Sequence, residues 1–336
     1  MTAYLKYISS YLPEQSLTNG MLNQEFPEWS VDKISSKTGV ENRHIAGVQE
    51  FSSDMAVAAA QKLFAEHNVS PGSIDFVILC TQSPDYFLPT TACLIQERLN
   101  IPVTAGAFDF NLGCSGYVYG LAIAKGLIYA GVATNILFLT AETYSKFIHR
   151  ADKSNRTIFG DAATATLITA DGGLATIGDF DLGTDGRGAE NLMVKRGGMR
   201  HERTQDNTAS MDEYDNAHND NFLYMNGPEI FNFTSAMVPP LVENVLKKNA
   251  LQMEDIGLFI FHQANKFMLN HLKKKINIPD GKFYVDMAEC GNTVCSTIPL
   301  AIGSALQRVS LSKGDKVLLA GFGVGYSWGG TVLTIC

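Results

Sequence analysis

The chain has 336 residues, a formal net charge of −8 and 46% hydrophobic residues. This composition is typical of a folded globular protein of about two domains, and it excludes a disordered chain, a coiled coil or a collagen-like repeat. The acidic excess argues against a nucleic-acid-binding protein, which usually carries net basic charge. Six cysteines without a C-x-x-C pair indicate neither a disulfide framework nor a structural zinc site.

Two segments bear on where the protein resides. The first fifteen residues lack a basic region followed by an apolar stretch, so we expect no signal peptide. From Phe110 to Ala141 the only charge is Lys125, and a run of this length is long enough to span a membrane. Glycines and polar residues interrupt it, so we interpret it as a buried helix near 114–130 followed by a buried strand near 135–141. The sequence therefore predicts a cytoplasmic protein without membrane contact.

The first half of the chain alternates between strand and helix patterns. A helix at about 54–67 precedes the apolar strand Ile74–Gln82, whose continuous hydrophobicity is typical of a strand buried on both faces. A helix from Pro89 to about Leu99, a strand at Ala105–Phe110, the helix and strand named above, and a strand at Ala163–Ala170 follow. This order predicts an α/β architecture with a mainly parallel sheet.

The second half repeats this plan more loosely. We expect a helix at Glu229–Asn249, which Pro239 and Pro240 should kink or divide. The other predicted elements are strands at Ala175–Leu182, Gly257–His262, Lys316–Gly321 and Thr331–Ile335, and helices at Asn265–Ile276 and Val294–Val309. The predicted domains are therefore two similar α/β halves, 1–172 and 173–336, whose strand ends meet at one shared crevice.

A polar segment at about 185–220 interrupts the second half. Thirteen of its 36 residues are charged, and it contains few apolar residues. Loops of this length are uncommon unless they are functional or disordered. Two interpretations remain open from the sequence, a surface excursion and a lid.

Cys114 is the first candidate for chemistry. It follows a predicted strand within Asn111–Gly116, where Gly113 permits a tight turn and a helix begins. Unpaired backbone N–H groups and the positive end of the helix dipole would face a thiol at this place, so we expect its pKa to fall by about one unit. The alternative is a small buried side chain without a chemical role, which is common for free cysteines.

His262 and Asn292 are the second and third candidates. His262 lies at the exit of a buried strand, and Asn292 lies in a Gly-Asn-Thr turn. Each residue alone would more often be structural. Together, a Cys, a His and an Asn at strand ends suit a thiolate nucleophile with two hydrogen-bond donors.

The glycine-rich segment Gly321–Gly325 resembles a dinucleotide-binding loop only superficially. It follows a strand, but its spacing is GxGxG and only 11 residues remain after it, too few for a further βαβ unit. We therefore reject a nucleotide cofactor. The glycines are expected to let backbone amides approach the active centre instead.

Taken in order, the motifs resemble β-ketoacyl-acyl carrier protein synthase III, a thiolase-like condensing enzyme. The resemblance extends over almost the whole chain. Besides the Cys114 turn it includes Tyr11–Glu14, Lys37–Val40 with Arg43–Ala46, Leu88-Pro89 with Ala92–Gln96, Ile158–Ala162, His262–Asn265, Gly291–Thr293 with Ile298-Pro299, and Gly321–Gly329. It implies a five-layered αβαβα fold of two duplicated halves, a homodimer, and no metal or redox cofactor.

The resemblance also implies a catalytic triad of Cys114, His262 and Asn292. Cys114 would take an acyl group from a thioester, while the other two would bind the carbonyl of a malonyl thioester as it decarboxylates. Two neutral donors stabilise an enolate oxygen without quenching the carbanion. The backbone N–H groups of Cys114 and Val324 would form the oxyanion hole. A valine can supply the second of these N–H groups only if its φ stays negative. Phe322 matches the aromatic residue that shields the triad.

The entrance to the site departs from the family pattern. Trp29 and Lys37 match positions at the coenzyme A site, with Lys37 in place of an arginine, and Leu88 and Asn265 are further candidates for substrate binding. A second arginine maps ambiguously to Lys153 or Arg156, and a tunnel asparagine maps to Pro228. These departures favour an acyl carrier protein, or a specialised acyl chain, over coenzyme A as the donor. In the inserted segment, Leu192, Met193 and Met199 are candidates to contact the acyl chain.

One basic cluster indicates a partner. Lys266, Lys273, Lys274 and Lys275 lie on one predicted helix in an acidic protein. They are either a solvated helix end or a docking surface for an acidic acyl carrier protein.

The alternatives to a condensing enzyme are a related acyltransferase, such as a hydroxymethylglutaryl-type synthase or an enzyme acylating oxygen or nitrogen, and a non-catalytic partner subunit. Asn292 argues against the thiolase type, and the intact triad argues against the inactive subunit. A cysteine protease also uses Cys, His and Asn, but nothing else in the chain fits one.

Overall fold

The structure is a computed structural model, and it describes residues 2–212 and 216–336. Its first half contains five strands of the main sheet and three long helices. In chain order these are β1 (Tyr4–Tyr11), α3 (Ser52–His67), β4 (Phe76–Cys80), α4 (Thr91–Arg98), β5 (Gly106–Phe110), α5 (Gly116–Tyr129), β6 (Asn135–Glu142) and β7 (Ala162–Thr169).

The second half contains the same series of elements. In chain order these are β8 (Ala175–Ile177), α7 (Gly227–Lys248), β14 (Leu258–Phe261), α8 (Lys266–Ile276), β15 (Phe283–Tyr284), α9 (Thr297–Arg308), β16 (Lys316–Gly323) and β17 (Ser327–Ile335). The predicted boundary at 172/173 falls in the short connection between β7 and β8.

The strand order repeats between the halves. The first half is ordered β1-β7-β6-β4-β5, with two antiparallel and then two parallel pairings, and the second is ordered β8-β17-β16-β14-β15 with the same senses. The pairing of β8 with β1 joins them into one continuous sheet path. The duplicated α/β fold predicted from the sequence is therefore confirmed.

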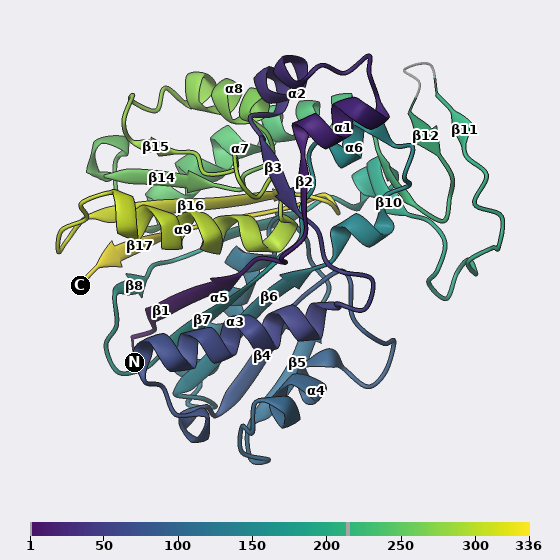
Figure 1. Cartoon of the computed structure of the whole chain (residues 1–336). Helices are drawn as coiled ribbons and strands as arrows, with labels where there is room; N and C mark the ends of the chain where they lie inside the picture. The colour runs from purple at the N-terminus through teal and green to yellow at the C-terminus, as the bar shows by residue number, and fades with distance from the viewer. Residues whose placement is uncertain (1, 213–215) are drawn as a thin grey trace.

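The helices complete five layers, which can be followed from top to bottom in Figure 1. α3 and α4 pack on the outer face of the first half-sheet, and α7 with α8 covers the second. α5 and α9 contact strands of both halves and form the layer between them. Their buried faces are rich in small residues such as Gly116, Gly120, Ala301 and Ala305, which lets the two half-sheets pack closely around them.

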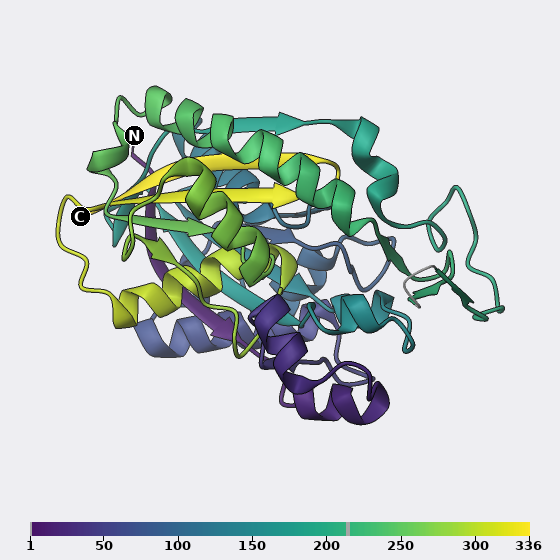
Figure 2. The same ribbon diagram turned by 90° about the horizontal axis from the view of Figure 1, so that it is seen from above.

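Smaller elements surround the crevice between the halves. α1 (Asn19–Glu25), α2 (Val31–Thr38), the pair β2 (Ser16–Thr18) and β3 (Asn42–His44), and the short α6 (Lys153–Arg156) lie on one side of it. Figure 2 shows α1 and α2 beside α6, with α7 crossing above the second half-sheet. These elements were not predicted from the sequence, and neither was β1.

The inserted segment forms an arm that extends from the body of the molecule (Figure 2). β9 (Asp181–Thr184) pairs with β17, and β10 (Leu192–Val194) pairs with β13 (Leu223–Met225) at the base of the arm. A second small pair, β11 (Ser210–Met211) and β12 (Ala217–His218), lies beyond it. Residues 213–215, within the predicted insertion, lie outside the described residues.

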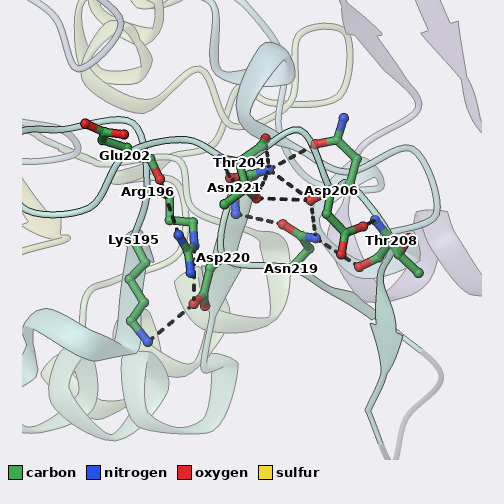
Figure 3. Close-up of polar contacts among 10 residues, drawn as sticks. Lys195, Arg196, Glu202, Thr204, Asp206, Thr208, Asn219, Asp220 and Asn221 are labelled. Atoms are coloured by element: carbon green, nitrogen blue, oxygen red, sulfur yellow. Dashed lines mark hydrogen bonds and ion pairs between the residues drawn. The ribbon is translucent and has the colours of Figure 1, made fainter.

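Hydrogen bonds give the arm its own polar core (Figure 3). The buried Asn221 side chain donates to the carbonyl oxygens of Thr204 and Asp206 and accepts from the Thr204 N–H. The Asn219 amide donates to the carbonyl oxygens of Asp206 and Thr208. Asp220 holds Lys195 at 3.5 Å and Arg196 at 3.9 Å. The segment is therefore held by side-chain to backbone bonds rather than by an apolar core.

Three predicted elements were wrong in detail. The strand expected at Ala175–Leu182 is divided into β8 and β9, because the chain at Gly178 turns against Val332 and Asn249 with no room for a side chain. The helix expected at Val294–Val309 begins with a 3-10 turn, Val294–Ser296. Of the two effects expected at Pro239-Pro240, division does not occur, since α7 is one continuous helix whose buried residues Val238, Leu241 and Val242 hold it against the sheet. The expected kink stays a prediction.

Among residues 2–212 and 216–336, no helix has the length and apolarity needed to cross a lipid bilayer. The run from Phe110 to Ala141 is folded as the end of β5, the helix α5 and the strand β6.

Candidate active site

Cys114 lies in the turn between β5 and α5, two residues before the helix begins. The end of β16 passes directly against this turn. A Cβ atom on Gly323 would lie 2.7 Å from Cys114 Sγ, and one on Gly321 would lie 2.8 Å from the Cys114 carbonyl oxygen. Only glycine fits at these two positions, so the segment Gly321–Gly325 brings backbone to the thiol, as the sequence analysis expected.

The backbone N–H of Val324 acts to lower the pKa of the Cys114 thiol. Val324 is absent from the residues with positive φ, so it meets the condition under which a valine can replace glycine at this position. The role of Val324 as an oxyanion-hole donor stays a prediction.

The expected fall in the thiol pKa was wrong. Cys114 is 7% exposed and belongs to an apolar cluster with Phe322, Val294 and Phe159. Burial raises the pKa of Cys114 to about 12, while the N–H groups of Val324 and Cys114 itself act in the opposite direction. Desolvation of the thiolate outweighs those backbone dipoles. The Cys114 side chain is thus a thiol at rest, and a reaction through its sulfur would need a proton acceptor.

His262 directly follows β14, which is parallel to β16, and its backbone N–H donates to the Ala320 carbonyl at 2.8 Å. Its Nδ1 lies 2.8 Å from Thr297 Oγ1, at the start of α9. The edge of the ring meets the Phe322 ring at 5.7 Å between centroids. Burial lowers the pKa of His262 to about 3, so the imidazole is neutral.

Asn292 is held in the loop between β15 and α9. Its N–H donates to the Ile158 carbonyl at 2.9 Å, and its carbonyl accepts from Gly160 at 3.1 Å. The side-chain Oδ1 accepts the Val294 N–H at 2.9 Å, and Nδ2 lies 3.4 Å from the Ala264 carbonyl. With Oδ1 accepting a backbone N–H and one N–H of the amide donated to Ala264, the second N–H of the NH₂ group is the one that can serve a further acceptor.

A continuous set of contacts joins these three residues. Phe322 links the Cys114 segment to His262, Thr297 links His262 to Val294, and Val294 links to Asn292. His262 is 2% exposed and Asn292 is 5% exposed. Cys114, His262 and Asn292, which were predicted at three separate strand ends, are thus all buried and are joined indirectly through Phe322, Thr297 and Val294. Their shared catalytic role stays a prediction.

A cavity of about 320 Å³ lies beside this centre. It is lined by Trp29, Lys37, Thr38, Ser154, Thr157, Ile158, Asn265 and Phe267. The cavity is connected to the buried centre through Ile158, whose carbonyl binds Asn292, and through Asn265, three residues after His262. Three of the five residues predicted to bind substrate, Trp29, Lys37 and Asn265, line it.

The cationic side chains around the cavity are largely engaged. Lys33 and Lys37 lie 5.0 Å and 5.3 Å from the Trp29 ring centroid. Lys153 pairs with Glu28 at 2.5 Å, and Arg156 forms a two-point ion pair with Glu25. Neither candidate for the second nucleotide-binding arginine lines the cavity.

Leu88 is not part of this site. It is 81% exposed on the connection between β4 and α4, next to the exposed Tyr86 and Phe87. Leu88 does not line the cavity in the single chain, and the expectation that it binds substrate stays a prediction.

The four predicted docking lysines lie at the two ends of α8. Lys266 is at the first turn, beside the cavity-lining Asn265 and Phe267, and its side chain packs on Gly39. The other three are in the last turn, where Lys273 pairs with Asp280, Lys275 donates to Ser235 and Lys274 is exposed. They do not form a single cluster.

The described part of the inserted arm contributes no residue to the lining of the cavity, but it contacts the rim. The cavity-lining Ser154 donates to Asn216 Oδ1 at 2.6 Å, and His149 meets the Phe222 ring edge-on at 4.9 Å. Of the residues proposed to contact an acyl chain, Leu192 belongs to the apolar cluster that contains Cys114, and Met193 is half-buried. Met199 is 94% exposed, so that assignment was wrong.

Two further buried groups were not identified from the sequence. Thr297 contacts His262, as described above. Glu142 is fully buried at the end of β6 and accepts hydrogen bonds from the Gln82 N–H, Ser83 Oγ and Cys295 Sγ. Burial raises the pKa of Glu142 to about 8. The sequence offered one signal for Glu142, namely a carboxyl group directly after the apolar strand predicted near 135–141.

Within the described part of the chain, no group of three or more His, Cys, Asp or Glu side chains is placed to hold a metal ion.

Comparison with known proteins agrees with this geometry. Family models described as 3-oxoacyl-[acyl-carrier-protein (ACP)] synthase III and its C-terminal part match residues 108–186 and 246–335. The β-ketoacyl-[acyl-carrier-protein] synthase III of Caldanaerobacter subterraneus is 33% identical over 329 residues, covering 96% of this chain and 95% of that protein. That of Nitratidesulfovibrio vulgaris is 35% identical, with 96% and 95% covered.

Solved structures give the same result. A crystal structure of a 3-oxoacyl-(acyl-carrier-protein) synthase III is 50% identical with a TM-score of 0.97, covering 100% of both chains. A 3-oxoacyl-(acyl-carrier protein) synthase from Burkholderia xenovorans is 36% identical with a TM-score of 0.90, covering 100% of this chain and 94% of that one. The fold is thus that of the thiolase-like condensing enzymes. Within that class, the chain belongs to the 3-oxoacyl-acyl-carrier-protein synthase III family.

Proposed function

We propose that this protein catalyses the decarboxylative condensation of an acyl thioester with a malonyl thioester, forming a β-ketoacyl thioester for fatty acid or related acyl-chain biosynthesis. The observation that carries the proposal is that Cys114, His262 and Asn292 are all buried and are joined by a series of contacts through Phe322, Thr297 and Val294. A nucleophile beside preorganised donors is the arrangement that two-step acyl transfer requires.

The reaction has two halves. In the first, Cys114 attacks the thioester carbonyl, the bond to the donor thiol breaks, and the acyl group remains on sulfur. The N–H groups of Cys114 and Val324 stabilise the tetrahedral oxyanion. In the second, His262 and Asn292 bind the malonyl carbonyl oxygen, CO₂ leaves, and the enolate carbon attacks the acyl-enzyme. Phe322 packs against the His262 ring and keeps water from the enolate.

The cavity beside the centre is proposed as the path for the pantetheine arm, with Trp29, Lys37 and Asn265 on its wall. We propose an acyl carrier protein as the partner, since Lys33 and Lys37 occupy the Trp29 face and Lys153 and Arg156 are already paired, which leaves little to hold a nucleotide. The proposed reaction uses acyl and malonyl thioesters and no metal or redox cofactor.

A cytoplasmic homodimer is also proposed. The exposed apolar residues Tyr86, Phe87 and Leu88 lie on the β4–α4 connection, near the end of the sheet where β5 is the edge strand. A patch of this kind is typical of a surface that a second copy covers.

The direct test is intact-mass measurement after the purified protein meets a panel of acyl thioesters, followed by malonyl thioester and product analysis. We expect the mass of one acyl group to appear and then to be released as a β-ketoacyl thioester. Cys114→Ala, the matched control, should gain no stable acyl mass. An acyl mass that appears but leaves only to water or to another acceptor would contradict condensation.

A further inference from the structure

Arg43 is a buried cation near the candidate site that the proposed reaction does not use. It lies in β3 and is fully buried. Burial lowers the pKa of Arg43 to about 10, so its guanidinium is still charged near neutral pH. A charge that is withdrawn from water costs folding free energy unless hydrogen bonds compensate it. The partners of this guanidinium therefore indicate which parts of the fold it holds together.

The guanidinium of Arg43 joins the two walls of the cavity. On one side, Nε donates to the Thr157 carbonyl oxygen at 3.1 Å, and Nη2 donates to the same oxygen. Thr157 lines the cavity. On the other side, Nη1 donates to Asn19 Oδ1. A planar guanidinium presents its donors in fixed directions, so these contacts set the distance between Asn19 and Thr157.

Asn19 carries the connection to the opposite wall. It is buried at the start of α1, and its Nδ2 donates to Ser35 Oγ at 2.9 Å. Ser35 belongs to α2, which also contains the cavity-lining Lys37 and Thr38. Arg43 is thus bonded directly to one wall of the cavity and through Asn19 to the other.

The aliphatic stem of Arg43 also lies against the turn that holds Asn292. A Cβ atom on Gly160 would lie 3.4 Å from Arg43 Cβ, and one on Gly291 would lie 3.3 Å from Arg43 Cγ. The Gly160 N–H donates to the Asn292 carbonyl at 3.1 Å, and the Asn292 N–H donates to a carbonyl of the same segment, 157–160. Arg43 therefore bonds to the start of this segment and packs against its end.

We propose that Arg43 is a positioning residue that sets the separation of the two cavity walls and, through segment 157–160, the place of the Asn292 amide. The proposal rests on the proposed function, since it assigns Arg43 to the malonyl half-reaction in which Asn292 acts. In the part of the chain that the structure describes, the hydrogen bonds of the guanidinium go to these two walls and not to the Cys114 turn. Its loss should therefore impair the malonyl half-reaction more than acylation.

The experiment compares wild type with Arg43→Met, which keeps the stem against the two glycines and removes the guanidinium. The matched control is Arg98→Met, because Arg98 also joins two elements, through an ion pair with Asp54 at 2.9 Å, and lies on α4. At saturating substrate, CO₂ release from malonyl thioester should fall about tenfold in Arg43→Met, less than the ~10²–10³ expected when a donor itself is lost. Single-turnover acylation should stay within about threefold of wild type, as should both rates in Arg98→Met.

Arg43→Lys separates the geometry of the guanidinium from its charge. Lysine keeps the positive charge but lacks the planar fork, so it should hold one wall of the cavity and not both. We expect CO₂ release to fall in Arg43→Lys as well, and KM for the acyl donor to rise in both variants. Wild-type values in Arg43→Lys would show that the charge alone is required, and would overturn the positioning role.

A second measurement needs no substrate. Hydrogen–deuterium exchange at the backbone amides of Gly160 and Asn292 should be faster in Arg43→Lys than in wild type, because these N–H groups bond between the turn and segment 157–160. The amides of α4 should keep their wild-type exchange. Unchanged exchange at both positions, or equal losses of acylation and CO₂ release, would refute the proposal. Wild type that releases no CO₂ from malonyl thioester, while exchange changes as expected, would count against the proposed function alone.

Discussion

Val294 donates its backbone N–H to Asn292 Oδ1 over 2.9 Å while its own φ is +57°, in the left-handed region. A β-branched residue rarely adopts this conformation. The turn it makes is what directs its N–H back to Asn292 and its carbonyl to Thr297. The orientation of the donor amide is thus obtained at the expense of local backbone strain, as is common beside active sites.

This strain predicts an unusual order of stability between two variants. At most buried positions alanine is more stable than glycine by roughly 0.5–1 kcal/mol. At position 294 the left-handed backbone costs an L-residue about 1–2 kcal/mol, so Val294→Gly should be more stable than Val294→Ala. Urea unfolding measures the difference. The control is Ala301→Gly in α9, where glycine should be less stable than alanine. If glycine is also less stable than alanine at position 294, Val294 is not strained.

Asn292 should separate the two half-reactions. Asn292→Asp keeps the size of the side chain but replaces its NH₂ donor with an acceptor, and Asn292→Ala removes the group. Both should still acquire an acyl mass, because Cys114, Val324 and His262 are untouched. Loss of one oxyanion-type donor reduces rate by about 10²–10³, so CO₂ release from malonyl thioester should fall by that amount. Condensation at the wild-type rate in either variant would refute the assigned role.

Glu142 should make stability depend on pH. Burial raises its pKa from 4.5 to about 8 in the folded protein. The folded state therefore binds more protons than the unfolded state between these values, and the free energy of unfolding should fall as pH rises from about 4.5 to about 8. His262, whose pKa falls to about 3, acts in the opposite sense below its usual 6.5. The difference in the free energy of unfolding between wild type and Glu142→Gln isolates the effect of the carboxyl group. If this difference does not change with pH, the pKa of Glu142 is not raised.

The arm can be removed without disturbing the core, because β10 and β13 are already paired at its base. Replacing 195–222 with a short turn keeps Leu192 and Leu223, which are buried in the cluster around Cys114. We expect acylation at saturating donor to persist and KM for the donor to rise several-fold, since the rim loses the bond from Ser154 to Asn216. Ser154→Ala should reproduce part of this effect. An unchanged KM in both variants would show that the arm does not support the entrance.

The last turn of α8 tests the carrier-protein partner. Lys274 is exposed and Lys275 bonds only to Ser235, so reversing both charges leaves the fold intact. Lys274→Glu with Lys275→Glu should raise KM for carrier-linked malonate several-fold, more at low salt than at high salt, because surface charges are screened. KM for malonyl-coenzyme A should stay the same. If the double variant and wild type have the same KM for carrier-linked malonate at low salt, these lysines do not belong to the docking surface.

The sequence predicted the fold and the centre where local signals were strong. Apolar runs such as Ile74–Gln82 and turns such as Asn111–Gly116 mark strand ends, and the order of strand ends is what brings Cys114, His262 and Asn292 together. β1 escaped detection because Tyr4–Tyr11 contains a buried Ser9, a half-buried Lys6 and a bulge instead of regular alternation. Its position is decided by pairing with β7, a contact distant in sequence.

The details of the centre depend on burial, which the sequence does not show. The position of Cys114 before a helix predicted a low thiol pKa, but the apolar side chains that enclose it come from distant segments of the chain and raise the pKa instead. In the same way, the contact of Thr297 with His262 joins residues 35 positions apart. The positions of Lys37 and Trp29 at the cavity were predicted only through the family resemblance.

The repeated strand order also means that the two halves contribute unequally. Each half has one loop after its first parallel strand and one after its edge strand: β4–α4 and β5–α5 in the first, β14–α8 and β15–α9 in the second. The reaction centre uses three of these four equivalent loops, carrying Cys114, His262 and Asn292. The fourth, β4–α4, corresponds to the His262 loop, yet it carries Gln82 and Ser83, which bind Glu142, and then the exposed Tyr86–Leu88. A two-fold repeated scaffold thus holds the three candidate residues asymmetrically: two lie in the second half, one lies in the first, and the β4–α4 loop carries none of them.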